Sequence, residues 1–356
     1  MTTVERLLTA IAAHGLAGSS TGSVSLSPTR DEWLALQGPL VRERLTGMAA
    51  LLHGKGVLRL DDESTRELAE VDARWSSHTL RAEDVLLAVV RMLDDAGIPH
   101  RVLKGPALAE LAWRWGEARR WVDADLLVPA DRLDEVIERC MADGATRAVP
   151  ELRPGFDRRF AKSVTLRSEL GPEIDLHRTL VLGPHQFLVP ISDLWSGPRA
   201  FASDDHELHT LSAEATLVHA CMHATITGAS RLASLRDVVE AFDGCAVDEV
   251  TRLAERWKAR PMVRDAGEAA AERLGLHDHP FVLWSRGVLP SPEEERLASV
   301  YRSSNRTARN LAMASLRYVP GIADKVRFAV GIAMPSSENR SSRGRSVVDQ
   351  FRRLVG

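Results

Sequence analysis

The chain has 356 residues, of which 44% are hydrophobic and 27% are charged, and its formal net charge is −3. This composition is that of an ordinary globular protein, and it excludes disordered, collagen-like and coiled-coil chains. The small net charge also excludes a chain-wide positive field that would attract nucleic acid. The three cysteines include no C-x-x-C pair, so we expect no disulfide framework and a cytoplasmic location.

Hydrophobic periodicity divides the chain into four regions. Residues 1–80 and 211–333 follow helical patterns, and residues 334–356 form a basic tail that we expect to be flexible. Residues 81–210 alternate short β-rich stretches with helical ones in the order β-α-β-α-β-β, which predicts a small α/β or α+β core. The longest apolar run near the C-terminus, Phe328–Met334, has seven residues, whereas a membrane span needs about 20, so we expect no membrane partner.

The core elements are predicted in chain order from these patterns. They are a strand at 98–103, a helix at 106–115, a strand at 119–128, a helix at 133–144, and two strands at 162–167 and 173–177.

The first predicted strand runs into Lys104, Gly105 and Pro106. Glycine lets a ligand approach the backbone closely, and proline suits the first position of a helix. Free N–H groups at a helix start attract anions, and Lys104 adds a positive charge at the same place. The pattern indicates either a phosphate-binding turn or an ordinary strand–helix turn.

Two carboxylates follow on the second predicted strand, at Asp123 and Asp125. Residues two apart in a strand share a face, so these side chains point the same way. Adjacent carboxylates repel each other and resist burial, and a hard cation such as Mg²⁺ compensates for this through oxygen ligation. The alternative is an exposed strand end with two solvated acids.

A third set of polar residues alternates with apolar ones at Glu173, Asp175 and His177. A carboxylate on a neighbouring strand is what a two-metal phosphoryl-transfer site requires, because its two ions lie about 4 Å apart. We therefore expect Asp175 to join Asp123 and Asp125. His177 is a candidate for orienting a carboxylate or contacting substrate.

Taken together, these motifs resemble the nucleotidyltransferase superfamily of the DNA polymerase β type. They resemble more closely a bacterial family of nucleotidyltransferases, mostly without an assigned reaction, in which the turn reads Leu-Lys-Gly. The superfamily turn is usually Gly-Gly or Gly-Ser. The matching residues are Leu103-Lys104-Gly105, Arg119, Asp123-Ala124-Asp125, and Ile174-Asp175-Leu176-His177. The resemblance covers about residues 80–245 and implies an α+β fold, with a small mixed-sheet nucleotidyltransferase core flanked by helical regions.

The resemblance implies an enzyme that moves NMP from an NTP, such as ATP, to an acceptor and releases pyrophosphate. Asp123, Asp125 and Asp175 would be catalytic and would hold Mg²⁺ or Mn²⁺. Lys104, Gly105 and Arg119 would bind the nucleotide. The acceptor stays open among a small molecule, a peptide or protein, and RNA, and the oligomeric state is open too. The alternatives are a toxin-like transferase acting on tRNA or protein, and an inactive binding module of the same fold.

Other polar residues allow more than one interpretation each. Arg119 either neutralises the acids, contacts a phosphate or forms an ordinary ion pair. His219 and His223 have an i, i+4 spacing that can bind zinc, but no third ligand is evident, so we expect core histidines or histidines behind the site. Asp237 is either a residue behind the site or part of a surface ion pair. The arginines of the tail, from Arg340 onward, are either solvated or contact an acidic partner.

Overall fold

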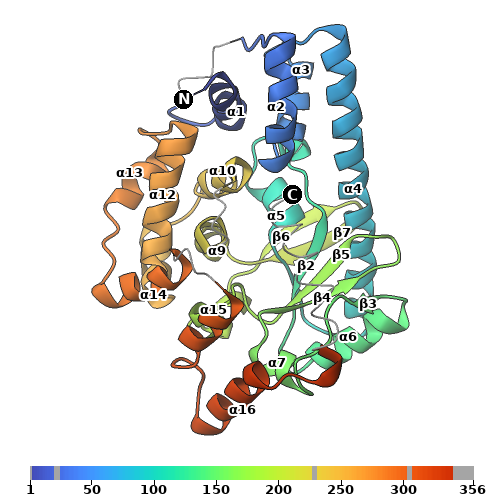
Figure 1. The fold of residues 1–356 in the computed structure, drawn as a ribbon, viewed down its shortest axis with the longest axis vertical. Coiled ribbons are helices and arrows are strands. Elements are labelled where there is room, and N and C mark those ends of the chain that lie inside the picture. Colours follow the sequence, from blue (N-terminus) through green and yellow to red (C-terminus); the bar gives the residue numbers. More distant parts are fainter. Residues whose placement is uncertain (1, 20–24, 227–230, 303–306, 340–356) are drawn as a thin grey trace. The chain divides into compact units, whose positions relative to one another are not determined.

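A computed structural model describes residues 2–19, 25–226, 231–302 and 307–339. The chain forms two compact units, each assembled from separate stretches of sequence. Unit 1 consists of residues 1–80, 104–121 and 212–298, and unit 2 consists of residues 81–103, 122–211 and 299–356. The fold class is α+β, as predicted, with a small mixed sheet and helical regions on either side of it in the sequence (Figure 1).

Unit 1 is helical, and local sequence signals fix where its first helices begin. Thr2 precedes α1 (Thr3–Ala13) and Thr29 precedes α2 (Arg30–Arg42); each threonine forms a capping box with the glutamate three residues later. A capping box satisfies two N–H groups that a helix start leaves without partners. Its other helices are α3 (Thr46–Gly54), the first part of α4 (Asp62–Asp95), α5 (Gly105–Leu111), α9 (Ala213–Ile226), α10 (Leu232–Ala241), α11 (Val247–Arg256), α12 (Arg260–Leu274), α13 (Pro280–Arg286) and most of α14 (Pro292–Arg302).

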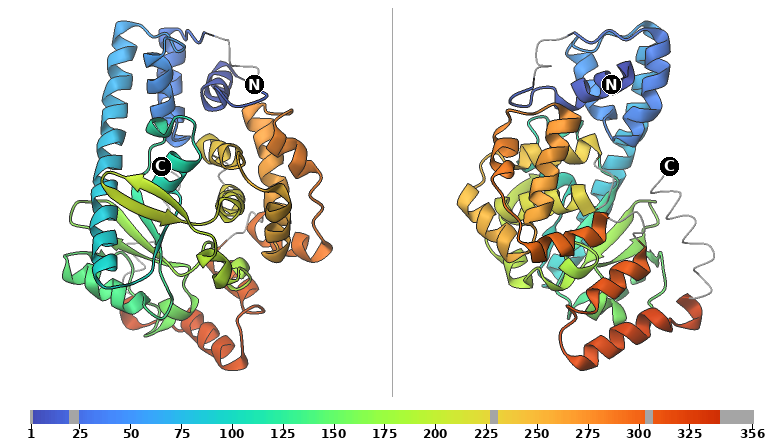
Figure 2. Two further views of the ribbon diagram at one scale, coloured as in Figure 1. Left: turned by 180° about the vertical axis from the view of Figure 1, so that it is seen from behind. Right: turned by 60° about the vertical axis from the view of Figure 1, so that its left-hand side comes forward.

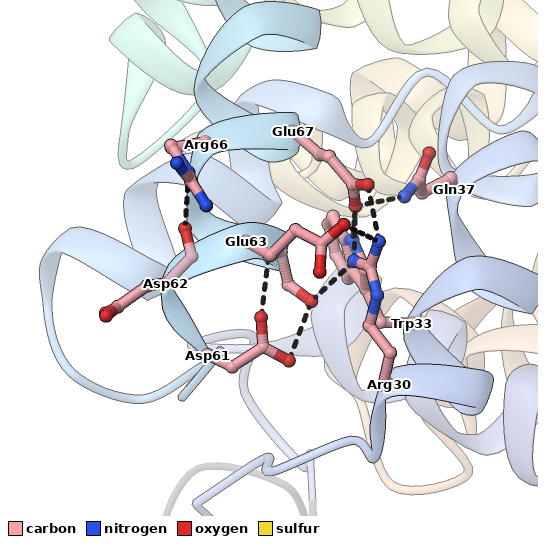
Figure 3. Close-up of polar contacts among 9 residues, drawn as sticks. Arg30, Trp33, Gln37, Asp61, Asp62, Glu63, Arg66 and Glu67 are labelled. Carbon is pink, nitrogen blue, oxygen red and sulfur yellow. Dashed lines mark hydrogen bonds and ion pairs between the residues drawn. The ribbon is translucent and has the colours of Figure 1, made fainter.

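A polar network centred on Glu67 joins α2 to α4 (Figure 3). The Glu67 carboxylate accepts two hydrogen bonds of 2.6 Å from the Arg30 guanidinium. It also accepts 2.8 Å hydrogen bonds from Trp33 Nε1 and Gln37 Nε2. One carboxylate therefore accepts hydrogen bonds from Arg30, Trp33 and Gln37 of α2, which links the two helices at this point.

The later helices of unit 1 pack around α9, against which α10, α11 and α12 lie directly, with α13 against α12 (Figure 2). Ser212 caps α9, since its Oγ accepts a hydrogen bond from the Ala215 N–H. The middle of α9 is buried on all sides, which explains why its sequence is apolar almost throughout.

Unit 2 contains a five-stranded sheet in the order β1-β2-β5-β4-β3 (Figure 1). The central strands β2 (Asp123–Leu127) and β5 (Glu173–His177) pair in parallel, and the other pairs are antiparallel. The outer strands are β1 (Arg101–Val102), β3 (Thr146–Arg147) and β4 (Ser163–Arg167). One face carries the apolar side chains of the three inner strands, all buried: Ala124, Leu126, Val164, Leu166, Ile174 and Leu176. The opposite face carries the polar residues of these strands together with the buried Leu127.

Helices and a second sheet complete unit 2. A separate core cluster of Phe156, Phe160, Val319 and Phe328 joins α7 to α16. The helices are the second part of α4, α6 (Leu133–Ala142), α7 (Phe156–Phe160), α8 (Ile191–Trp195), α15 (Ala308–Ser315) and α16 (Ile322–Ala333). Across the described ranges, no helix combines the length and apolar character that crossing a membrane requires.

Several element boundaries differ from the sequence prediction. The predicted strand at 98–103 shortens to Arg101–Val102, and the predicted helix at 133–144 ends at Ala142. The predicted helix at 106–115 ends at Leu111, and the predicted strand at 119–128 begins only at Asp123. Arg119 follows a short 3-10 turn (Gly116–Ala118). It therefore lies outside β2 and does not share a strand face with the aspartates.

The sequence prediction also lacked the edge strand β3, the short helix α7, and a hairpin formed by β6 (Arg199–Ser203) and β7 (His206–Thr210). The hairpin turns at Asp204, which takes a left-handed backbone conformation with φ of 52°. A non-glycine residue adopts this conformation infrequently, so the turn gave no glycine signal.

The four predicted regions did not treat residues 104–121 as a separate segment. Residues 104–121 lie within the predicted core but belong to unit 1. The part of the predicted tail beyond residue 339, including all of its arginines, lies outside the described residues.

Candidate active site

The candidate acidic residues of unit 2 come together through the register of β2 and β5. Asp123 lies opposite Glu173, Asp125 opposite Asp175, and Leu127 opposite His177. Residues paired across two strands project to the same face of the sheet. The polar residues of the two strands therefore share one face of the sheet, together with Leu127.

Three of these side chains form a compact cluster. One ligand atom from each of Asp125, Asp175 and His177 lies within 4.8 Å of those of the other two. Asp125 and His177 are buried, with 4% and 0% of their surfaces exposed, and Asp175 is half-buried. The cluster therefore opens to solvent on the Asp175 side.

The protonation of His177 is constrained by its two neighbours. Nδ1 lies 3.1 Å from the carbonyl oxygen of Thr179, and Nε2 lies 2.7 Å from Asp125 Oδ1. The carbonyl and the carboxylate oxygens are both acceptors, so each ring nitrogen donates when it carries a proton. With its single proton on Nδ1, a neutral His177 donates to Thr179 and leaves Nε2 without a proton. The nitrogen that faces the carboxylates is Nε2, which is the atom a neutral His177 would offer to a metal.

Asp175 is oriented by a residue that the sequence analysis missed. The Thr165 hydroxyl on β4 donates a hydrogen bond to Asp175 Oδ1, and the two residues are direct partners in the sheet. The available signal was the alternation in β4, which places Thr165 on one face between the buried Val164 and Leu166. The strand order needed to connect Thr165 with Asp175 was not predictable from that signal.

The donor set of this cluster fits a divalent cation. Two carboxylates and one imidazole nitrogen within 4.8 Å are ligands typical of first-row divalent metals, and the nitrogen suits Mn²⁺ better than Mg²⁺. This is the one grouping of three or more potential metal ligands found in the described ranges. Asp123 is one pair further along the same face and outside this grouping.

The candidate nucleotide-binding residues belong to unit 1. Lys104 takes φ of 52° and ψ of −125°, and Gly105 begins α5 with φ of 25°. Arg119 forms an ion pair within this unit, in which its Nε and Nη2 donate to the Asp237 carboxylate at 2.7 and 3.0 Å. Its Nη1 donates to the carbonyl oxygen of Gly105 at 2.8 Å. The structure thus brings Lys104, Gly105, Arg119 and Asp237 together.

The two histidines of α9 also lie in unit 1. His219 is buried and His223 is half-buried. Neither belongs to a three-ligand grouping within the described ranges.

Comparison with known proteins identifies the family to which the chain belongs. Residues 31–275 match the sequence profile of a family described as uncharacterised nucleotidyltransferase. Among solved structures, the chain is similar to an antigenic nucleotidyltransferase-like protein from Paracoccidioides brasiliensis, with 13% identity, a TM-score of 0.33, and coverage of 55% of this chain and 93% of that chain. No curated protein matches. Because the family match spans more than half of the sequence, the chain belongs to the uncharacterised nucleotidyltransferase family.

Proposed function

We propose that this protein is a Mg²⁺- or Mn²⁺-dependent nucleotidyltransferase that moves NMP from an NTP to an acceptor. The acceptor oxygen or nitrogen attacks the α-phosphorus and forms the new bond, the bond from the α-phosphorus to the bridging oxygen breaks, and pyrophosphate leaves. The observation that carries the proposal is the cluster of Asp125, Asp175 and His177 on adjacent strands, in a chain of this family.

We assign a distinct role to each candidate site residue in unit 2. Asp125 and Asp175 supply carboxylate ligands, and Asp123 extends the acidic face beside them. A divalent cation bound there would neutralise phosphate charge and lower the pKa of an acceptor hydroxyl. His177 completes the ligand set through Nε2, and Thr165 holds Asp175 in its orientation. The protein thus contributes mainly positioning and electrostatic stabilisation.

The nucleotide-binding part of the proposal concerns unit 1 and has its own test. Lys104 offers a positive charge on a tightly turned backbone, and we assign it to the phosphates of the NTP. Substitution Lys104→Ala should raise the KM for NTP more than it lowers kcat, because a charge that binds the ground state and the transition state equally affects mainly substrate affinity.

The direct test of the metal site measures cation binding by calorimetry, with Mn²⁺ as the probe. Wild-type protein should bind Mn²⁺, and Asp125→Asn should abolish that binding. Asp131→Asn, which alters an exposed acid of the same unit, should bind as wild type does. A wild-type protein that does not bind Mn²⁺ would overturn the metal assignment.

Transfer is tested separately, with α-labelled NTPs, Mn²⁺ or Mg²⁺, and candidate acceptors of the three classes. Release of pyrophosphate that depends on Asp125 supports the transferase. Binding of NTP without any transfer would instead support an inactive binding module. Label appearing on tRNA or protein would identify the acceptor class.

A further inference from the structure

The turn at Lys104 and Gly105 has a backbone that needs outside support. Lys104 has a φ of 52° with a ψ of −125°, a combination that a residue with a Cβ rarely adopts. Gly105 follows with a φ of 25°. Such conformations persist only where the surrounding structure holds them, and they often occur at functional sites.

A chain of hydrogen bonds leads from this turn to Asp237 on α10. Arg119 Nη1 donates to the carbonyl oxygen of Gly105 at 2.8 Å. The same guanidinium binds both oxygens of Asp237 through Nε and Nη2, a two-point contact that fixes the plane of the arginine. Trp113 Nε1 donates to Asp237 Oδ1 at 2.7 Å, so the carboxylate is also held in place.

Burial makes this arrangement sensitive to the charge of Asp237. The side chains of Arg119 and Asp237 are each only 12% exposed. Removing one charge of such a pair leaves the other buried without compensation, which is strongly unfavourable. Arg119 would then turn toward solvent and release the Gly105 carbonyl.

We infer that Asp237 is a positioning residue, which holds the Lys104–Gly105 turn in its binding conformation through Arg119. The importance of that turn for nucleotide binding rests on the proposed function, whereas the coupling of Asp237 to the turn rests on the hydrogen bonds alone. Asp237 acts through Arg119 and not on a substrate directly.

The scarcity of lysine gives a readout that does not depend on activity. The lysines of the chain are Lys55, Lys104, Lys162, Lys258 and Lys325. A protease specific for lysine can therefore cut at few bonds, and one of them is the Lys104–Gly105 bond. In Asp237→Asn we expect cleavage after Lys104 to become about tenfold faster, as expected when a hydrogen bond to a charged group is lost, while cleavage after Lys258 stays at the wild-type rate.

A closely matched control lies one residue away. Arg120 binds the Asp72 carboxylate through Nε and Nη2 and donates to the carbonyl of Glu117. That pair lies in the same unit and is comparably buried, at 16% and 18% exposed. Asp72→Asn should leave cleavage after Lys104 unchanged, because the hydrogen bonds of Arg120 go to Asp72 and Glu117 rather than to Lys104 or Gly105.

The outcomes separate this inference from the proposed function. Faster cleavage after Lys104 in Asp237→Asn but not in Asp72→Asn supports the inference, and so does an accompanying loss of NTP affinity with unchanged Mn²⁺ affinity. Equal cleavage in wild type and Asp237→Asn overturns it. A wild type that binds no NTP overturns the proposed function and leaves the cleavage result valid. If Asp237→Asn speeds cleavage after every lysine, Arg119→Lys, which retains the positive charge, replaces it in the test. Faster cleavage after Lys104 in that variant supports the inference, and an unchanged rate overturns it.

Discussion

His177 Nε2 and Asp125 Oδ1 are 2.7 Å apart, although 52 residues separate them in the sequence. His177 is the register partner of Leu127 rather than of Asp125, so its ring reaches back along the sheet to meet the carboxylate. This contact joins two separate sequence motifs in one potential metal site, in which His177 lies beside both Asp125 and Asp175.

Substitution His177→Ala should lower Mn²⁺ affinity at least tenfold, a loss typical for groups that orient or complete a metal site. Calorimetric titration measures this change. His209→Ala, which removes a half-exposed histidine of the same unit, should retain wild-type affinity. Unchanged Mn²⁺ affinity in His177→Ala would remove this residue from the ligand set.

Thr165 provides a second test of the same site. Thr165→Val preserves the shape of the side chain but removes the hydroxyl that donates to Asp175. We expect about a tenfold loss of Mn²⁺ affinity, because the carboxylate loses the partner that orients it. Thr165→Ser restores a hydroxyl and should restore most of the affinity. Equal affinities in the valine and serine variants would argue against this role.

The Glu67 network predicts a pH-dependent stability. The hydrogen bonds from Arg30, followed by those from other partners, lower the pKa of Glu67 from its usual 4.5 to about 2. The ionised form is therefore favoured in the folded protein, and its stabilisation is present above pH 4.5 and is lost as the pH falls toward 2. Glu67→Gln should lower Tm most at neutral pH, and the difference from wild type should narrow below pH 4.5.

The control for that experiment is Glu63→Gln. Glu63 also pairs with Arg30, but its side chain is 65% exposed, and such pairs contribute little to stability. Its Tm should follow that of the wild type across the pH range. A difference between wild type and Glu67→Gln that is the same at pH 7 and pH 3 would contradict the assignment.

The three cysteines should differ in their reactivity toward a thiol reagent at pH 8. Burial raises the pKa of Cys140 to about 12 and also raises that of Cys221, whereas Cys245 is partly exposed. Because the thiolate is the reactive form, we expect one thiol to react rapidly in the folded protein and three to react after denaturation. Cys245→Ser should abolish the rapid reaction. Rapid modification of two or three thiols in the folded protein would contradict the burial of Cys140 and Cys221.

The sequence predicted the features that depend on neighbouring residues. Alternation in β2 and β5 placed Asp123 with Asp125, and Glu173 with Asp175, on common faces, because strand geometry repeats every two residues. The family resemblance pointed to the fold class that the structure has.

The features that the sequence could not provide depend on tertiary structure. The register that sets Asp125 beside Asp175 is a property of strand pairing. The partner of Arg119 is 118 residues away, and no local pattern identifies it. The Asp204 turn is a local feature and was missed for a different reason: the residue in the left-handed conformation is an aspartate rather than a glycine.

The interleaving of the two units has a consequence for biosynthesis. The chain passes from one unit to the other after residues 80, 103, 121, 211 and 298. A nascent chain that has reached residue 211 therefore contains neither unit in full, and unit 1 is complete only once residue 298 has been made. Truncation that ends the chain before residue 298 should for this reason remove parts of both units, whereas a shorter truncation should affect unit 2 alone.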